Sequence, residues 1–411
     1  MEASVEAFIR ERLAVGLKRL KTWVEQNTHT RNGDGVERHA TQLEEAFAAL
    51  GFAAERPPAG VDGCGRHLFL RRPGSADGPA AALIAHMDTV FPEAEEREND
   101  FRWKELEGRI YGPGTWDIKG GSLMILLLLE LVQREDPALF ERVEWHIALN
   151  SSEEILNHHF GVLCRQCFPE NTKAALVFEG DSTPDAAREC RLIWQRKGRG
   201  IFRLLAEGQG AHAGASHEQG VNAIRQLARA VEPLECLTDY RKGLTVNIGR
   251  IEGGVDFNRV PHRAEARMEI RAPDGKTLEA AIAAAQTVVR NQMVLVSGDG
   301  KTRGRIRLET LQIDPSWDAN PGSQLLFEVW QSAGSELGIE LKALARGGLS
   351  DGNFLWQHIP TIDGLGPAGG NAHSSEWSDG DSPKRPEYIL AESYVPKLKL
   401  HFAALQRLLS Q

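Results

Sequence analysis

The sequence lacks the features that mark several classes of protein. Its 411 residues contain only 5 cysteines, at scattered positions, so a disulfide framework is not expected. The longest apolar run, 123–129, is far too short to span a bilayer. The N-terminus has neither the basic start nor the apolar stretch of a signal peptide. We therefore expect a soluble, cytoplasmic protein with no membrane partner.

An excess of positive charge is also missing. The chain has 57 acidic residues and 48 lysines and arginines, which give a net charge of -9. It also has no run rich in Lys or Arg, so no nucleic-acid partner is expected. The hydrophobic fraction of 41% and the charged fraction of 26% are those of an ordinary globular protein. At this length one hydrophobic core stops growing, which favours two domains.

The hydrophobic pattern predicts an α/β catalytic domain. Apolar residues at helical spacing predict helices over 4–26, 36–50 and 121–135. Short apolar runs predict buried strands over 80–85, 143–149 and 174–178. This alternation is typical of a mainly parallel sheet flanked by helices.

The pattern changes from about residue 193. The order of predicted elements becomes β-α-β-β-α-β, which indicates a compact α+β (ferredoxin-like) insert. The predicted strands are 200–207, 245–252, 264–271 and 303–308, and the predicted helices are 220–232 and 277–293. We therefore expect a discontinuous first domain, 1–192 and 310–411, and an inserted domain, 193–309.

Polar side chains follow the predicted strands of the first domain. His86 and Asp88 end one strand and, being two residues apart, leave it on the same face. Ligands of open α/β sheets bind at this edge. His86 is therefore a candidate metal ligand and Asp88 its hydrogen-bond acceptor. The alternative is an ordinary hydrogen-bonded histidine at a strand end.

Three further segments extend this pattern. Asp117 lies in a glycine-rich turn, where it either caps the next helix or faces a ligand that the backbone approaches closely. The adjacent carboxylates of Glu153 and Glu154 are costly to bury unless a cation offsets them, and the alternative is a solvated helix start. Glu179 follows a strand in the same way, and His373 lies in a glycine-rich loop.

Taken together, these motifs resemble those of the M20 family of metallopeptidases and amidohydrolases, in particular its carboxypeptidase G2 branch. The resemblance covers the chain from about Trp23 onward, with all motifs in family order. The motifs are HMDTVFP (86–92), YGPGTWDIKGG (111–121), SSEE (151–154), FEGDS (178–182) and GGNAHS (369–374).

The resemblance implies a zinc-hydrolase catalytic domain that binds two Zn²⁺ per chain, although Co²⁺ or Mn²⁺ suits the same donors. His86 and Glu179 would bind one ion, and Glu154 and His373 the other. Asp117 would bridge the two ions, and the peptide bond after it would be cis. Zinc lowers the pKa of a bound water to about 7, so a nucleophile would be available at neutral pH.

The resemblance also implies roles for other residues. Glu153 would be the general base. The insert would be a lid and dimerisation domain, and its His212 would stabilise the oxyanion in a partner subunit's site. The implied catalytic residues are Glu153, Asp88 and His212, and the implied substrate contacts are Asn247, Arg271, Gly348 and Ser350.

The sequence therefore predicts a homodimeric metallohydrolase that cleaves an amide bond next to a free carboxylate. A carboxypeptidase acting on small peptides and a deacylase acting on N-acyl amino acids both fit. An aminopeptidase fits less well, because Arg271 suits a substrate carboxylate. A catalytically inactive metal-binding homologue is the remaining alternative, and it has no need of a base such as Glu153.

Overall fold

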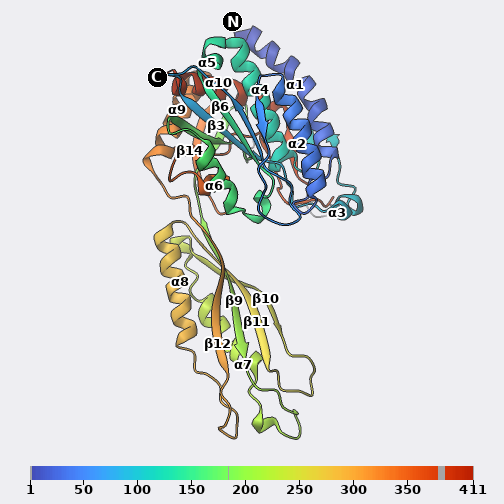
Figure 1. Cartoon of the computed structure of the whole chain (residues 1–411), viewed down its shortest axis with the longest axis vertical. Coiled ribbons are helices and arrows are strands. Elements are labelled where there is room, and N and C mark those ends of the chain that lie inside the picture. Colours follow the sequence, from blue (N-terminus) through green and yellow to red (C-terminus); the bar gives the residue numbers. More distant parts are fainter. Residues whose placement is uncertain (1, 184, 378–384, 411) are drawn as a thin grey trace. The chain divides into compact units, whose positions relative to one another are not determined.

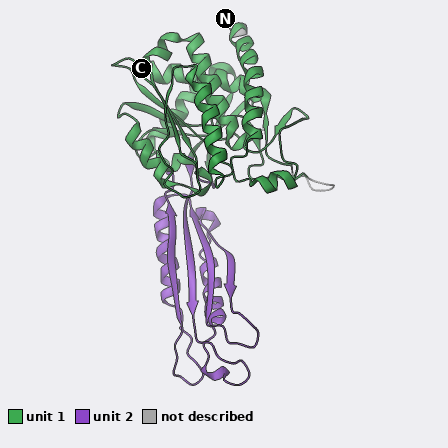
Figure 2. Cartoon of the chain, turned by 45° about the vertical axis from the view of Figure 1, so that its right-hand side comes forward, with its two compact units in different colours: residues 1–194, 319–345, 350–411 green, residues 195–318, 346–349 purple. Residues whose placement is uncertain are grey.

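The computed structural model describes residues 2–183, 185–377 and 385–410. The chain divides into two compact units, which Figure 2 shows in different colours. Unit 1 comprises residues 1–194, 319–345 and 350–411, and unit 2 comprises residues 195–318 and 346–349. Unit 2 therefore extends past the expected boundary at residue 309, and it also includes the separate short segment 346–349.

Unit 1 is built on a six-stranded sheet with the order β1-β2-β6-β3-β7-β14. Strands β6, β3, β7 and β14 run parallel to one another, whereas β1 and β2 pair antiparallel at one edge. The strands are β1 (Ala53–Glu55), β2 (Leu68–Arg72), β3 (Ala80–His86), β6 (Glu144–Asn150), β7 (Thr172–Val177) and β14 (Thr361–Ile362). The prediction of an α/β fold with a mostly parallel sheet is confirmed.

Both faces of the sheet are buried. Successive residues of a strand point to opposite faces, so each central strand contributes to two hydrophobic clusters. In β3, Ala81, Leu83 and Ala85 belong to one hydrophobic cluster, and Ala82 and Ile84 belong to another. Helices cover the two faces, as Figure 1 shows. The central strands therefore read as continuous apolar runs, without the alternation of a half-exposed strand.

The helices of unit 1 begin and end close to the sequence signals for them. Helix α4 is buried on nearly all sides and follows directly from the glycine-rich turn that holds Asp117. The helices are α1 (Glu2–Glu25), α2 (Gly33–Ala48), α3 (Glu93–Glu98), α4 (Gly120–Glu135), α5 (Pro137–Arg142), α6 (His158–Cys167), α9 (Pro321–Leu337) and α10 (Tyr394–Leu409).

A smaller antiparallel sheet carries the remaining loops of unit 1. Its order is β15-β16-β5-β4, and it joins the segment before Asp117 to the segments around His373. Its strands are β4 (Lys104–Leu106), β5 (Arg109–Tyr111), β15 (Gly369–Gly370) and β16 (Tyr388–Leu390). Strands β8 (Glu189–Arg196) and β13 (Glu340–Arg346) form a two-stranded ribbon.

Unit 2 has the chain order β9-α7-β10-β11-α8-β12 and the sheet order β10-β11-β9-β12, with antiparallel neighbours. This is the βαββαβ order expected from the sequence. Both helices pack on one face of the sheet, where alternate residues such as Phe202, Leu204 and Met268 form a separate core. The elements are β9 (Gly198–Glu207), α7 (Ala223–Glu235), β10 (Thr245–Gly253), β11 (Arg263–Ala272), α8 (Gly275–Arg290) and β12 (Arg305–Asp314).

No helix in the described part of the chain is both long enough and apolar enough to cross a membrane.

A buried ion pair in unit 1 gives a test of the packing. Lys397 Nζ lies 2.8 Å from Asp181 Oδ2, and both side chains are almost fully buried. Because Lys397→Met leaves the buried Asp181 carboxylate without its cation, we expect the free energy of unfolding to fall by about 3–5 kcal/mol. Chemical denaturation measures this quantity.

Lys399→Met is the matched control, two residues further along α10. Lys399 pairs with Glu6, and both side chains are partly exposed, so the loss of this pair should cost about 1 kcal/mol. Equal losses from the two variants would contradict the assignment of a buried, compensated charge at Lys397.

Candidate metal centre

Three neighbouring parallel strands bring acidic and imidazole side chains to one edge of the large sheet. Strand β3 lies between β6 and β7, and the three strands run in the same direction. Their carboxyl ends therefore meet at one edge, where open α/β sheets bind ligands. His86 ends β3, Glu153 and Glu154 follow β6, and Glu179 follows β7.

Asp117 reaches this edge from the glycine-rich turn before α4. A Cβ atom on Gly121 would lie 2.1 Å from the main-chain oxygen of Phe178, the residue before Glu179. A Cβ on Gly120 would lie 2.2 Å from the oxygen of Thr115. The glycines thus let the start of α4 approach the strand end that carries Glu179. The Asp117–Ile118 peptide bond is cis, as the family resemblance implies.

The five predicted ligands form two groups that share Asp117. In the first group, His86 Nε2 lies 2.9 Å from Asp117 Oδ1 and 3.8 Å from Glu179 Oε1. In the second, His373 Nε2 lies 3.4 Å from Asp117 Oδ2 and 3.2 Å from Glu154 Oε2. Within each group the ligand atoms lie within 4.8 Å of one another. The two carboxylate oxygens of Asp117 therefore face different groups.

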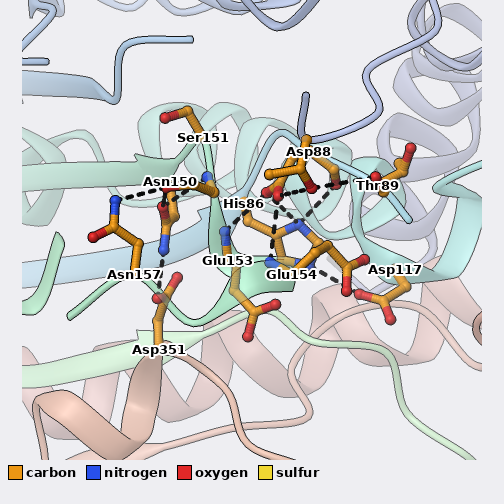
Figure 3. A network of polar contacts seen from close by, with 12 residues as sticks. His86, Asp88, Thr89, Asp117, Asn150, Ser151, Glu153, Glu154, Asn157 and Asp351 are labelled. Carbon is orange, nitrogen blue, oxygen red and sulfur yellow. Dashed lines mark hydrogen bonds and ion pairs between the residues drawn. The ribbon is translucent and has the colours of Figure 1, made fainter. Parts of the chain in front are cut away.

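Asp88 was expected to accept a hydrogen bond from His86 with its carboxylate, but the structure differs. The main-chain oxygen of Asp88 accepts from His86, and the carboxylate binds other groups. His86 Nδ1 donates to the main-chain oxygen of Asp88 at 2.9 Å, whereas the Asp88 carboxylate is 3.5 Å away. That carboxylate accepts from the main-chain N–H groups of Glu153 (3.1 Å) and Glu154 (3.3 Å) and from the hydroxyl of Thr30 (2.7 Å). Asp88 thus fixes the turn that presents both glutamates (Figure 3).

The carboxyl and imidazole groups at this edge strongly shift one another's pKa values. Burial raises the pKa of Glu153 well above its usual range, and the neighbouring carboxylates add to the shift. Burial and the charge of Asp117 raise the pKa of Glu154 to about 7. Hydrogen bonds to Asp117 and Glu154 raise the pKa of His373 to about 11. Burial opposes the charged form of His86, yet hydrogen bonds to Asp117 and Asp88 raise its pKa well above the usual range.

Without a cation, protons therefore balance the negative charge of the site. The donor set contains two imidazole nitrogens and carboxylate oxygens from three residues, a combination that suits Zn²⁺ and similar divalent ions. Two cations placed in the two groups would replace the protons on the imidazoles. The residues present thus fit a pair of divalent metal ions that share Asp117.

Other polar residues lie beside Glu153, to its left in Figure 3. Asn150 Nδ2 donates to the buried carboxylate of Asp351 at 2.7 Å, and Asn150 Oδ1 accepts from the N–H of Ser152 at 3.0 Å. Asn157 Nδ2 donates to the hydroxyl of Ser152 at 2.8 Å. Sequence reasoning missed the roles of Asn150, Asn157 and Asp351 here. Only Asp351 had a signal, because it ends the glycine-rich segment 347–351.

Sequence reasoning also missed Glu387, whose buried carboxylate accepts from the main-chain N–H groups of Trp116 (2.9 Å) and Asp117 (3.2 Å). Nothing in the sequence indicates this contact, because it joins segments about 270 residues apart.

The predicted lid histidine, His212, lies in an exposed loop of unit 2. Its Nδ1 accepts from the N–H groups of Gly214 and Ala215, each at 3.1 Å. A nitrogen that accepts two hydrogen bonds carries no proton, so the neutral ring holds its proton on Nε2. His212 lines a pocket with Gly210, Ala211, Asn258 and Arg259.

The predicted substrate contacts Asn247 and Arg271 lie on neighbouring strands of the same sheet, since Asn247 pairs with Glu269. Arg271 donates from Nε and Nη2 to the carboxylate of Glu269 at 2.6 and 3.1 Å, and from Nη1 to the main-chain oxygen of Gly347 at 2.8 Å. These contacts use three of the five N–H donors of a guanidinium and leave two.

The predicted contacts Gly348 and Ser350 belong to different units. In unit 2, Arg196 donates to the main-chain oxygens of Gly348 (3.1 Å) and Leu349 (3.2 Å). In unit 1, Ser350 is fully buried, and its hydroxyl donates to Asp363 at 2.9 Å and accepts from the N–H of Gly352 at 3.2 Å. The Ser350 side chain is therefore bonded to its own unit.

Comparisons with known proteins find peptidases and a deacetylase among the relatives of this chain. The peptidase dimerisation domain of the M20 family matches residues 195–295. Carboxypeptidase G2 of Pseudomonas sp. (strain RS-16) is 28% identical over 389 residues, which cover 91% of this chain and 87% of the relative. Acetylornithine deacetylase of Proteus mirabilis is 28% identical over 58% of this chain and 60% of that protein.

These matches confirm the predicted resemblance to the M20 family. Solved structures show the same fold. A Bacillus cereus aminopeptidase superposes with a TM-score of 0.72 at 21% identity, covering 97% of this chain and 98% of its own. A Bacillus subtilis protein described as a dinuclear metal-binding peptidase of the M20 family gives a TM-score of 0.66 at 13% identity, with 98% and 99% coverage. The chain therefore shares its fold with these solved structures.

The pKa values of the site predict proton release when metal is bound. Both imidazoles have raised pKa values and are protonated at pH 7 in the metal-free protein, yet each must be neutral to bind a metal. Loading with Zn²⁺ at pH 7 should therefore release at least two protons per chain, because the ligand Glu154, whose pKa is about 7, is also partly protonated without metal. Metal affinity should fall as the pH is lowered.

Titration calorimetry in buffers with different ionisation enthalpies measures this release. The variant His373→Ala should release about one proton fewer. An observed heat that is independent of the buffer would contradict the prediction.

Proposed function

We propose that this protein is a metal-dependent hydrolase that cleaves a peptide or N-acyl amide bond next to a free carboxylate. The observation that carries the proposal is the sharing of Asp117 between two ligand groups, with the carboxylate of Glu153 buried beside them. The similarity to carboxypeptidase G2 over most of both chains supports the same activity class.

The five ligands would hold two divalent ions, with Asp117 between them. When bound, such ions supply Lewis acidity, which polarises an amide carbonyl and makes water acidic enough to attack it at neutral pH. Zinc is our choice of metal because imidazole and carboxylate together suit it, although Co²⁺ and Mn²⁺ accept the same donors.

Glu153 would serve as the general base. Its main-chain N–H is held by Asp88, and its side chain is 7% exposed, so it is fixed in place and nearly free of bulk water. Burial favours its protonated form, whereas nearby cations favour the carboxylate. Glu153 would take a proton from the attacking water and deliver it to the leaving nitrogen.

His212 would donate a hydrogen bond to the developing oxyanion. The two N–H groups that bind its Nδ1 leave the proton on Nε2, which is the donor that this role needs. The peptidase dimerisation domain in this chain supports a homodimer in which His212 of one subunit acts in the site of the other. We expect the dimer to form through unit 2.

Arg271 would bind the free carboxylate of the substrate, together with Asn247 and the N–H groups near Gly348. Glu269 holds the guanidinium on one side, and two N–H donors are left to form the paired hydrogen bonds that a carboxylate accepts. Because Ser350 is buried and bonded to Asp363, we assign it to holding the loop, without contact to substrate.

A second candidate function is deacylation of N-acyl amino acids, which the similarity to acetylornithine deacetylase favours. Both reactions cleave an amide next to a carboxylate, so the same residues serve both. Hydrolysis of a panel of dipeptides and N-acyl amino acids separates them. Activity that is lost with a chelator and restored by Zn²⁺ supports the proposal, and a metal-loaded protein inactive on the whole panel indicates the inactive homologue.

The substitution Glu153→Gln tests whether Glu153 is the general base or a metal ligand. Glutamine keeps the size of the side chain but cannot accept the proton, so kcat should fall by roughly a hundredfold or more. Metal content, measured by elemental analysis, should be unchanged.

Glu154→Gln is the neighbouring control. It removes a carboxylate of the second ligand group, so it should lower metal content. Loss of metal from Glu153→Gln instead would show that the roles of the two glutamates are exchanged.

The substitution Arg271→Lys tests carboxylate recognition. Lysine keeps the charge but loses the paired geometry, so affinity for free-acid substrates should fall by about ten- to a hundredfold. The matching amide substrates should be hydrolysed almost as before, and KM comparisons of acid and amide measure the difference.

Arg267→Lys is the matched control, on the same strand and the same face, where it pairs with Glu265. Arg267→Lys should leave the KM for both the free-acid and the amide substrates unchanged. An equal effect of Arg271→Lys on acids and amides would assign Arg271 a structural role.

A further inference from the structure

Glu387 is bound at the same time to the two segments that flank the second ligand group. Its carboxylate Oε1 accepts from the N–H groups of Trp116 and Asp117 at 2.9 and 3.2 Å. Its own N–H donates to the main-chain oxygen of Ser374 at 2.9 Å. Asp117 is the shared ligand, and Ser374 directly follows the ligand His373.

The loop that holds His373 needs such a contact. His373 and Asn371 have φ angles of 62° and 64°, in the left-handed region that residues with side chains rarely adopt. Conformations of this kind persist where surrounding contacts fix them. Here the contacts include Glu387 to Ser374 and the side chain of Asn371 to the main-chain oxygen of Arg385 at 2.9 Å.

The Glu387 side chain has no ion-pair partner within 4.0 Å among the described residues, and its Oε2 atom has no hydrogen bond. The carboxyl group is fully buried, and the nearby Lys119 donates to the main-chain oxygen of Gln26. Burial and the charge of Asp117 raise the pKa of Glu387 to about 8. A buried carboxyl group with one unpaired oxygen costs stability in either protonation state, so stability alone does not account for Glu387.

We infer that Glu387 is a positioning residue that fixes the Asp117 carboxylate relative to His373 and thereby sets the geometry of the second metal ion. The inference rests on the proposed metal centre. Residues that orient metal ligands typically change metal affinity by about 10- to 100-fold when they are replaced. If Glu387 only connected β16 to the segment after β5, its replacement would change the stability of the fold and leave metal affinity unchanged.

Two conservative variants distinguish the hydrogen bonds of Glu387 to the Trp116 and Asp117 N–H groups from its negative charge. Glu387→Gln keeps an oxygen that can accept both N–H groups and removes the charge. Glu387→Asp keeps the charge but is one methylene shorter, so it cannot reach both N–H groups without movement of the backbone. We expect Glu387→Gln to bind Zn²⁺ like the wild type and Glu387→Asp to bind it about 10- to 100-fold more weakly.

Metal affinity is measured by competition with a chromogenic chelator. Hydrogen exchange of the metal-free protein gives a second measurement that does not depend on metal or on activity. The Trp116 and Asp117 amides should exchange faster in Glu387→Asp and at the wild-type rate in Glu387→Gln. Leu405→Ala, a cavity variant in the core of α10, controls for lost stability and should keep its metal affinity.

Three outcomes would overturn the inference. They are wild-type metal affinity in Glu387→Asp, equal loss in both variants, and equal loss in Leu405→Ala. A wild-type protein that binds no divalent ion would refute the proposed function instead, and the exchange rates would still decide whether Glu387 holds Asp117.

Discussion

The crowding of carboxylates at one buried edge of a parallel sheet is the constraint on which the rest of the site depends. Asp88, Asp117, Glu153, Glu154 and Glu179 converge where three parallel strands end. Burial alone would make such a cluster strongly unfavourable. Protonated imidazoles and main-chain N–H groups offset part of the charge, and divalent cations would offset the rest.

Several features of the backbone serve this cluster. The glycines at the start of α4 allow this segment to approach the end of β7 closely. Asp88 holds the main chain of the Glu153–Glu154 turn. Local conformations that look costly in isolation, such as the left-handed His373, belong to the same arrangement. The ligand set is therefore maintained by main-chain contacts as much as by side chains.

Much of the fold could be predicted from local sequence patterns. The apolar runs at 80–85, 143–149 and 174–178 indicated the central strands because both faces of a covered parallel sheet are apolar. The βαββαβ order of unit 2 also followed from periodicity. The ligands could be proposed because each lies at a strand end or in a glycine-rich turn and matches a family motif.

What could not be predicted depends on contacts between distant segments. Glu387 contacts the site only after the chain has folded, so no local pattern marks it. Asp351 ends the glycine-rich segment 347–351, but its contact with Asn150 joins segments about 200 residues apart. That His86 contacts the main-chain oxygen of Asp88, and not its carboxylate, depends on the three-dimensional arrangement of the residues at the end of β3. The pairing of Arg271 with Glu269 depends on rotamers, although both residues lie on one strand face.

The division of unit 1 by the insert also has a consequence for the order of assembly during synthesis. His86, Asp117 and Glu179 all precede unit 2 in the chain, whereas the second group needs His373, which follows it. Chains are made from the N-terminus, and domains fold as their sequence becomes available. A nascent chain that has just completed unit 2 therefore contains every donor of one group but only two of the three donors of the other. Strand β14, at the edge of the sheet, and helix α10 are also still missing at that stage.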